Sequence, residues 1–182
     1  MSGSSEDERE KFVILLLGSS PDPLPSFWHL QKEVFIIAQT YPKTETLFKF
    51  DKGYEGPYCQ ALEDTAQEPI YHEDAMQISN GRILLTDKGK KMYRVFANEL
   101  ASNPKFLPLL SSMKMVRAIY DKLTIDELLF LIYSTYPKYA VFSNYSDRLL
   151  KNQQGRKSIC ESLLKKELIT EQRYTELLRD SP

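Results

Sequence analysis

The stretch that decides the fold runs from Leu47 to Phe96 and reads LFKFDKGYEGPYCQALEDTAQEPIYHEDAMQISNGRILLTDKGKKMYRVF. Near its middle, Asn80-Gly81 is the dipeptide that favours a type I′ turn between two short β-strands. Before it, Gly56-Pro57 predicts the start of a helix, because proline suits the first helical position. After it, Thr86 is a suitable N-cap for a second helix. Helix, β-hairpin and helix in this order are typical of a winged-helix module.

The residues around Gly56 predict three further local features. Leu47–Phe50 alternates apolar and polar side chains and is expected to form a short strand. Asp51-Lys52-Gly53 has the composition of a turn. The helix that follows is expected to span Tyr58–Glu68, with Pro69 closing it.

Two helices are expected before this stretch. Glu8–Leu17 carries a continuous apolar run that favours a helix and also permits a strand. Phe27–Thr40 has apolar residues at helical spacing and follows Ser26, a natural N-cap. Tyr41-Pro42 ends this second helix, because the residue before a proline disfavours helical geometry.

Beyond Asn103 the pattern is helical throughout. Pro104–Leu123 predicts a long helix, bent near Pro108. Thr124 and Glu127 have the spacing of a capping box at the start of the next helix. Another helix is expected to be broken near Gly155, and Thr170 to cap the last one, Glu171–Leu178.

These features together predict an α+β fold that is mostly α, with a winged-helix-like core, a β-hairpin wing and a helical C-terminal half. Residues 1–9 are expected to be a disordered polar tail and residues 10–102 the winged-helix-like domain. Residues 103–182 are expected to form a helical extension packed on that domain.

Composition narrows the classes of function. Apolar residues make up 42% and aromatic residues 12% of the 182 residues, which is ample for a packed core. The formal net charge of −1 gives no strong overall field, so nucleic-acid contact requires a local basic patch.

Cys59 and Cys160 could form one disulfide, but no cysteine or histidine spacing predicts a zinc site or another cofactor. The longest apolar run, Phe12–Leu17, is too short to span a bilayer, and the acidic start is unlike a signal peptide. We therefore expect a cytoplasmic protein without a membrane contact.

Several short motifs resemble those of a known family. Leu30-Gln31-Lys32, the Phe48-Lys49-Phe50 run and the motif Tyr54-x-Gly56-Pro57-Tyr58 are similar to segments of YwgA-like proteins. Gly81 to Gly89, with Leu84, Thr86, Lys88 and Gly89, is similar to the segment that follows the wing in many winged-helix proteins. More distantly, the order of these motifs resembles the Panacea domain of SocA-like antitoxins. Glu55 and Cys59 depart from the family pattern, which has a small residue and a serine there. The resemblance implies a winged-helix fold and a regulatory, antitoxin-like setting, and it supplies no catalytic residues.

The helix expected just before the hairpin has no lysine or arginine. Its outward positions are expected to include Gln60, Glu63 and Asp64. A helix in the DNA major groove lies between two rows of phosphates and depends largely on cations for affinity. This composition therefore favours a protein partner for the helix.

A basic cluster around and after the hairpin supports the alternative that DNA is bound. Its members could contact phosphates through the wing and the following helix, or could simply be a solvated helix face. They are Arg82, Lys88, Lys90, Lys91 and Arg94.

Aromatic residues of the C-terminal half supply a second candidate surface. Tyr139, Phe142 and Tyr145 are candidates for a protein interface or for homodimerisation, and core positions are the alternative. Stacking on single-stranded bases is less favoured, because few cations are interleaved with them.

Catalytic chemistry has little support in the sequence. His29 and His72 are the only histidines, and His72-Glu73-Asp74 is the only neighbourhood in which a histidine meets carboxylates. We keep a hydrolase using His72 as a third hypothesis.

The sequence predicts a non-enzymatic regulatory binding module acting through a protein partner or a homodimer, with a DNA-binding regulator as the alternative. No small-molecule substrate is indicated.

Overall fold

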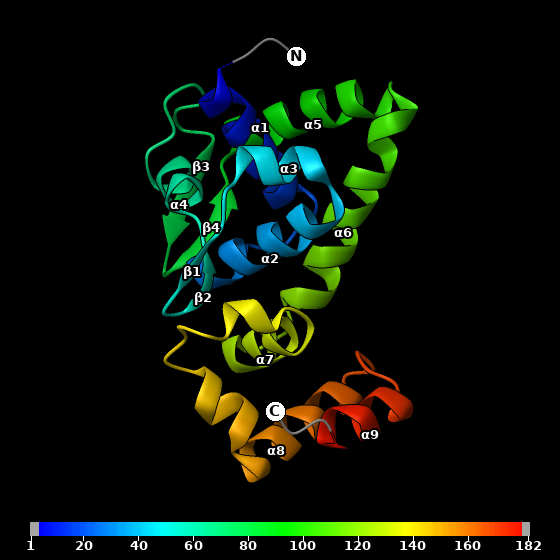
Figure 1. The fold of residues 1–182 in the computed structure, drawn as a ribbon. Helices are drawn as coiled ribbons and strands as arrows, with labels where there is room; N and C mark the ends of the chain where they lie inside the picture. Colours follow the sequence, from blue (N-terminus) through cyan, green and yellow to red (C-terminus); the bar gives the residue numbers. More distant parts are fainter. Residues whose placement is uncertain (1–3, 180–182) are drawn as a thin grey trace. The chain divides into compact units, whose positions relative to one another are not determined.

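The computed structural model describes residues 4–179 and divides the chain into two compact units (Figure 1). The first unit comprises Met1–Phe50 and Cys59–Lys122, and the second comprises Asp51–Tyr58 and Leu123–Pro182. The fold is α+β and mostly α, as predicted, with a winged-helix-like core and a helical C-terminal half. The sequence-based boundary at residue 103 does not coincide with a change of unit, because the first unit continues to Lys122.

The first unit holds most of the elements that the deciding stretch predicts. In chain order they are α1 (Ser5–Gly18), α2 (Phe27–Thr40), α3 (Pro42–Leu47), α4 (Gln60–Gln67), β3 (Met76–Ser79), β4 (Arg82–Leu85), α5 (Asp87–Ala101), η1 (Pro104–Phe106) and α6 (Leu107–Tyr120). The helix α2 has the predicted bounds, and its N-cap Ser26 accepts a hydrogen bond from the backbone N–H of His29.

The predicted hairpin is confirmed. Strands β3 and β4 pair antiparallel, with Ile78 opposite Ile83. Asn80 and Gly81 form the two-residue tip with φ values of 51° and 75°, as a type I′ turn requires. Leu24 forms an isolated antiparallel bridge to β4, because its N–H donates to the Ile83 carbonyl and its carbonyl accepts the Ile83 N–H. A hairpin that is braced in this way by the segment between the first two helices is the wing of the winged-helix-like core.

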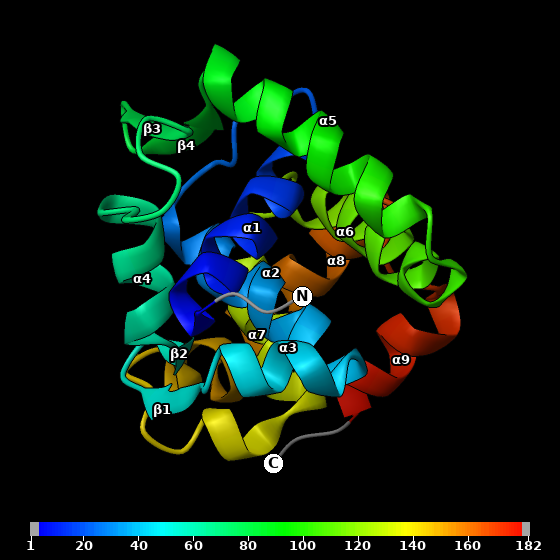
Figure 2. The ribbon, with the colours of Figure 1, turned by 90° about the horizontal axis from the view of Figure 1, so that it is seen from above.

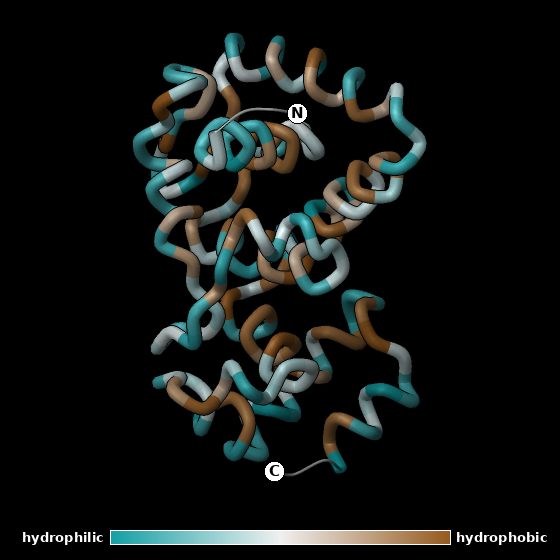
Figure 3. The backbone as a smooth tube through the Cα atoms, turned by 45° about the horizontal axis from the view of Figure 1, so that its top comes forward, coloured by the Kyte–Doolittle hydropathy of each residue, from teal (hydrophilic) through white to brown (hydrophobic). Residues whose placement is uncertain are grey.

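Helix α1 is the centre of the first unit. It contacts α3, α4, α5 and α6, and Figure 2 shows it enclosed among them. Its first turn is acidic and its second half, from Phe12 to Leu17, is fully apolar and buried, a change that is visible along α1 in Figure 3. A helix that is apolar on every side is stable only when other elements cover it completely.

The second unit combines a short hairpin with C-terminal helices. Its elements are β1 (Asp51–Gly53), β2 (Gly56–Tyr58), α7 (Ile125–Thr135), η2 (Pro137–Tyr139), the short π-helical turn η3 (Asp147–Lys151), α8 (Gln153–Lys165) and α9 (Glu171–Arg179). The capping box of Thr124 and Glu127 is present at the start of α7. The backbone N–H of Asn144 donates to the carbonyl of Tyr54 at 2.9 Å, which fastens the β1–β2 hairpin to the loop after η2.

The region around Gly56 corrects two predictions. Gly56-Pro57 does not begin a helix: Gly56 has a φ of 83°, outside the helical region, and lies with Pro57 in β2. Asp51-Lys52-Gly53 is the partner strand β1 and not a turn. The helix expected over Tyr58–Glu68 therefore begins only at Gln60, after Cys59.

Two other expected elements are placed differently. The expected strand Leu47–Phe50 is absent from the described structure, because Pro42 begins α3 and this helix includes Leu47. The long helix expected from Pro104 is divided into η1 and α6, so Pro108 lies in the first turn of α6 and not at a bend. The helical break that was predicted near Gly155 is at Asn152, between η3 and α8. The Asn152 side chain caps α8 by accepting the N–H of Gly155 at 3.0 Å.

Candidate binding surfaces

Helix α4 lies directly before the wing and has an exposed face of amides and carboxylates. Its start is fixed by Gln31 of α2, whose side-chain oxygen accepts the N–H of Cys59 at 2.8 Å and whose amide donates to the Cys59 carbonyl at 2.9 Å. On the outer side, Gln60 donates to Asp64 at 2.7 Å and Gln67 donates to Glu63 at 2.9 Å. The structure thus brings the predicted residues Gln60, Glu63 and Asp64 together on one acidic surface.

The predicted basic cluster is divided between engaged and unengaged side chains. The Lys88 ammonium donates to the Glu73 carbonyl at 2.6 Å, and Lys90 pairs with Asp87 at 3.2 Å. The side chains of Arg82 on β4 and of Lys91 and Arg94 on α5 are exposed and have no ion-pair or hydrogen-bond partner within residues 4–179. These three side chains are the ones able to meet an anion without first breaking an internal contact.

A groove of about 480 Å³ between α5 and α6 extends this basic region. Arg94 and Lys114 line it, and its described lining includes no aspartate or glutamate. Its other lining residues are Tyr93, Ala97, Asn98, Ala101, Leu107, Leu110 and Ser111. The groove offers two cations beside an apolar wall, a combination that the sequence pattern of α5 alone does not reveal.

The aromatic candidates of the second unit differ in exposure. Tyr139 is buried, and the ring of Tyr145 lies 5.4 Å from the Arg148 guanidinium carbon. Phe142 is 57% exposed, next to Val141 at 68% and in the same unit as Tyr54 at 71%. Of the three predicted aromatic residues, Phe142 is therefore the exposed one.

Both histidines have structural partners. His29 is buried on α2, and its Nδ1 lies 2.8 Å from the Ser26 hydroxyl that caps the helix. His72 Nε2 lies 3.0 Å from the Asp7 carboxylate, which also accepts from Lys11 at 2.7 Å. Burial would raise the pKa of Asp7, but the hydrogen bonds and charges of Lys11 and His72 outweigh it and hold the pKa below its usual value.

The loop that carries His72 is held by one carboxylate. Glu10 on α1 is buried and accepts the backbone N–H groups of Ile70, Tyr71 and His72 at 2.6 to 3.0 Å. The same interaction explains why a buried acidic residue lies just before the apolar second half of α1. Its partner lies about sixty positions away in the sequence, so no local pattern could reveal it.

The residues usually found in metal sites are not gathered at any one place in the described structure. Across residues 4–179 no group of three or more His, Cys, Asp or Glu side chains could hold a metal ion. Cys59 and Cys160 are buried free thiols in different units and do not form the disulfide that their number permits. Burial raises the pKa of the Cys160 thiol.

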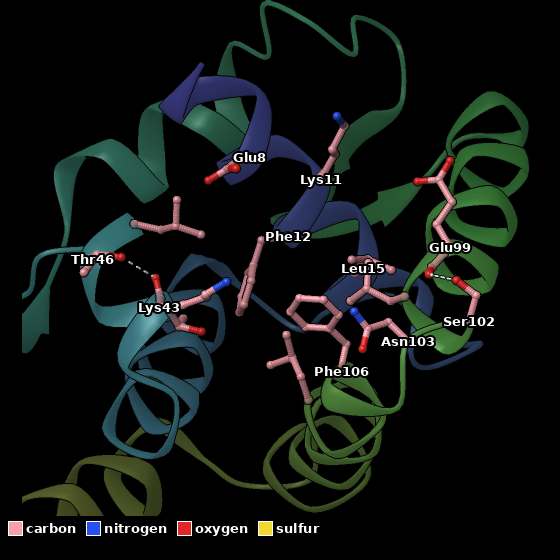
Figure 4. Close-up of a pocket in the computed structure, with 14 residues that line it drawn as sticks. Glu8, Lys11, Phe12, Leu15, Lys43, Thr46, Glu99, Ser102, Asn103 and Phe106 are labelled. Carbon is pink, nitrogen blue, oxygen red and sulfur yellow. Dashed lines mark hydrogen bonds between the residues drawn. The ribbon is translucent and has the colours of Figure 1, made fainter. Parts of the chain in front are cut away.

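A cavity of about 620 Å³ lies in the first unit (Figure 4). Its walls come from α1, α3, α5, η1 and α6. Figure 4 shows the rings of Phe12 and Phe106 within it and the Lys43 ammonium directed toward the Phe12 ring. No sequence pattern predicts this cavity, because its lining is drawn from five elements and carries no local motif.

Searches of protein-family models, curated proteins and solved structures found no match to this chain. Within residues 4–179, no helix combines the length and the apolar character that crossing a bilayer requires.

Proposed function

We propose that this chain is a non-enzymatic, winged-helix-type binding module with a regulatory role, acting through a protein partner or through self-association. The observation that carries the proposal is the exposed face of α4, which holds Gln60, Asp64 and Gln67 and no cation and is followed directly by the exposed Glu68. In a winged-helix module the helix just before the wing is placed to meet the partner. The short motifs that resemble YwgA-like and Panacea proteins support a regulatory setting.

Charge is the reason to prefer a protein over DNA at α4. Carboxylates directed at a phosphate backbone repel it, and a major-groove helix without lysine or arginine has no compensating attraction. A basic protein surface would instead find complementary charge, which speeds encounter and fixes the orientation of the partner. Hydrogen bonds such as Gln60 to Asp64 hold the acidic face in a defined geometry.

Self-association has its own support, because one unit displays both signs of charge. The acidic surface is on α4, and the unengaged cations Lys91 and Arg94 are on α5. Two copies related by a two-fold axis could pair α4 of one with α5 of the other twice over, which is the arrangement of an isologous dimer.

The second candidate function is DNA binding through the wing and α5. The specific observation in its favour is that Arg82, Lys91 and Arg94 are exposed without partners in the described chain. Backbone contacts by these residues would supply affinity without sequence readout.

Two charge-reversal pairs separate these functions. In the first variant Glu63 and Asp64 are changed to lysine, and in the second Lys91 and Arg94 are changed to glutamate. A matched control changes Lys157 and Lys165, exposed on α8, to glutamate. Each protein is measured by light scattering at low and high salt, by a pull-down of protein partners, and by fluorescence anisotropy with a random DNA duplex.

If the chain acts by self-association, we expect a salt-sensitive dimer that is lost in both the α4 and α5 variants and kept in the control. If it acts through a protein partner, we expect a protein that is captured by wild type and not by the α4 variant. If instead the chain is a monomer that binds duplex DNA, and the α5 variant lowers the salt slope by about two, the DNA function is the correct one.

A further inference from the structure

The cavity of the first unit has the size and lining of a ligand site. Its volume of about 620 Å³ is within the range of small-molecule pockets. Its apolar lining includes the buried side chains of Phe12, Leu15 and Leu100 and the partly exposed side chains of Leu47, Phe106 and Leu109. An apolar hollow with a few polar groups at its edge is what a medium-sized amphipathic molecule requires.

Lys43 is the lining residue whose charged group is directed toward the aromatic rings of this hollow. Its ammonium lies 5.6 Å from the centre of the Phe106 ring, and Figure 4 shows it directed toward Phe12 as well. No carboxylate lies within ion-pair distance of it in the described chain. A cation held over aromatic rings without a counter-ion is placed to receive an anionic head group.

The other charged lining residues are Glu8, Lys11 and Glu99. Lys11 is already paired with Asp7 at 2.7 Å. In Figure 4 the Lys11 ammonium and the Glu99 carboxylate are directed away from the rings of Phe12 and Phe106. Glu8 and Glu99 would attract a cationic head group, so the test of this site includes a cationic probe as well as an anionic one.

We propose that this cavity binds an amphipathic monocarboxylate, with its apolar body against Phe12, Leu15 and Phe106 and its carboxylate on the Lys43 ammonium. The site is built from α1, α3, α5, η1 and α6 and does not involve the exposed face of α4. The inference therefore goes beyond the proposed function and does not depend on it.

The contribution of each group sets the expected size of the effects. Each buried methylene strengthens binding by about three- to fourfold, so two methylenes amount to about tenfold. A charge-assisted hydrogen bond at the cavity edge is worth at least another tenfold. A carboxylate of adequate chain length should therefore bind much more tightly than the alcohol of equal length.

The test uses the full chain and four probes below their micelle concentrations: octanoate, decanoate, decan-1-ol and decylamine. Affinity is measured by titration calorimetry for wild type, for Lys43→Met and for Phe106→Ala, with Lys49→Met as the matched control on an exposed lysine that does not line the cavity. Circular dichroism establishes that each variant is folded, and the decanol affinity of Lys43→Met reports directly on whether its cavity is intact.

We expect saturable binding of one decanoate, about tenfold tighter than octanoate and at least tenfold tighter than decanol. Lys43→Met should lose at least tenfold in decanoate affinity and keep its decanol affinity, Phe106→Ala should weaken both, and Lys49→Met should change neither. The proposal is overturned if decanoate does not bind, if decanol or decylamine binds as tightly, or if Lys43→Met binds decanoate like wild type.

Discussion

The guanidinium of Arg117 on α6 lies 3.8 Å from the carboxylate of Glu33 on α2, and both side chains are completely buried. Arg117 also donates to the carbonyls of Leu16, Leu17 and Asp22 and to the Asp121 carboxylate at 2.7 to 3.1 Å. The last carbonyls of a helix lack partners within it and carry partial negative charge. One buried cation thus satisfies the end of α1 and joins it to the connecting segment and to α6.

Replacing Arg117 with methionine should destabilise the first unit by about 3–5 kcal/mol, because it leaves buried carbonyls and carboxylates without their cation. Urea unfolding followed by the fluorescence of Trp28, the only tryptophan, measures the change in this unit. Lys90→Met removes an exposed ion pair on α5 and should change stability by less than about 1 kcal/mol. A loss equal to that of Lys90→Met would show that Arg117 is not the central contact that its geometry indicates.

Glu33 should give the first unit an unusual pH dependence. Burial, followed by the nearby Asp121 carboxylate, raises the pKa of Glu33 well above 4.5, against the opposing charge of Arg117. The folded state therefore holds this proton to higher pH than the unfolded state does, and the contribution of Glu33 to stability falls as pH rises above 4.5. Glu33→Gln cannot ionise, so its stability relative to wild type should increase over the same range. Parallel pH profiles for the two proteins, from urea midpoints between pH 4 and pH 8, would contradict this.

The sequence predicted those parts of the fold that depend on neighbouring residues. The caps at Ser26, Thr86 and Thr124 and the turn at Asn80-Gly81 are local, and the structure confirms each of them. The misplacement at Gly56 has a non-local cause, since β1 and β2 pair with each other and pack in the second unit. Gly-Pro fits a helix start and a strand equally well until that packing is known.

Candidate sites were predictable to a smaller extent. The absence of cations from α4 can be read from composition, whereas the engagement of Lys88 with the Glu73 carbonyl cannot. An aromatic run does not reveal which ring faces outward, and Tyr139 is buried while Phe142 is exposed. The cavity beside Lys43 and the pairing of Glu33 with Arg117 join residues from distant elements, so no periodicity in the sequence could indicate them.

Glu10→Gln should destabilise the first unit by about 2 kcal/mol. The carboxylate accepts three backbone N–H groups, and an amide side chain would turn an N–H toward at least one of them. Native-state hydrogen exchange should show faster exchange of the amides of Ile70, Tyr71 and His72. Glu45→Gln, on an exposed residue of α3, is the matched control and should leave these amides unchanged. Slow exchange in Glu10→Gln would mean that the loop does not depend on this carboxylate.

Gly89 should be less tolerant of alanine than the glycine at the tip of the wing. A Cβ at Gly89 would lie 2.0 Å from the Ala75 carbonyl oxygen, so the start of α5 and the base of the hairpin would have to separate. Gly81 has open space around it, and alanine there suffers only the strain of a φ of 75°, about 1 kcal/mol. Thermal unfolding should therefore show a larger loss for Gly89→Ala than for Gly81→Ala, and the reverse order would contradict the close packing of wing and helix.

Lys166→Met should destabilise the second unit in a pH-dependent way. Glu127 on α7 accepts from the Lys166 ammonium at 2.6 Å, from the Ser162 hydroxyl at 2.6 Å and from the backbone N–H of Thr124 at 2.7 Å. Burial alone would raise the pKa of Glu127, but these hydrogen bonds and the lysine charge lower it. The stabilisation is therefore present above pH 4.5 and is lost as pH falls through the lowered pKa.

Near neutral pH we expect Lys166→Met to lose about 1–3 kcal/mol, because a buried carboxylate loses its cation. Hydrogen exchange of the α7 and α8 amides reports on this unit separately from Trp28. Lys165→Met is the control, since Lys165 is exposed beside Lys166 and should change exchange little. The difference in stability between Lys166→Met and wild type should shrink as the pH is lowered below 4.5. A stability difference that stays constant with pH would show that Lys166 acts through packing of its alkyl chain and not through the Glu127 carboxylate.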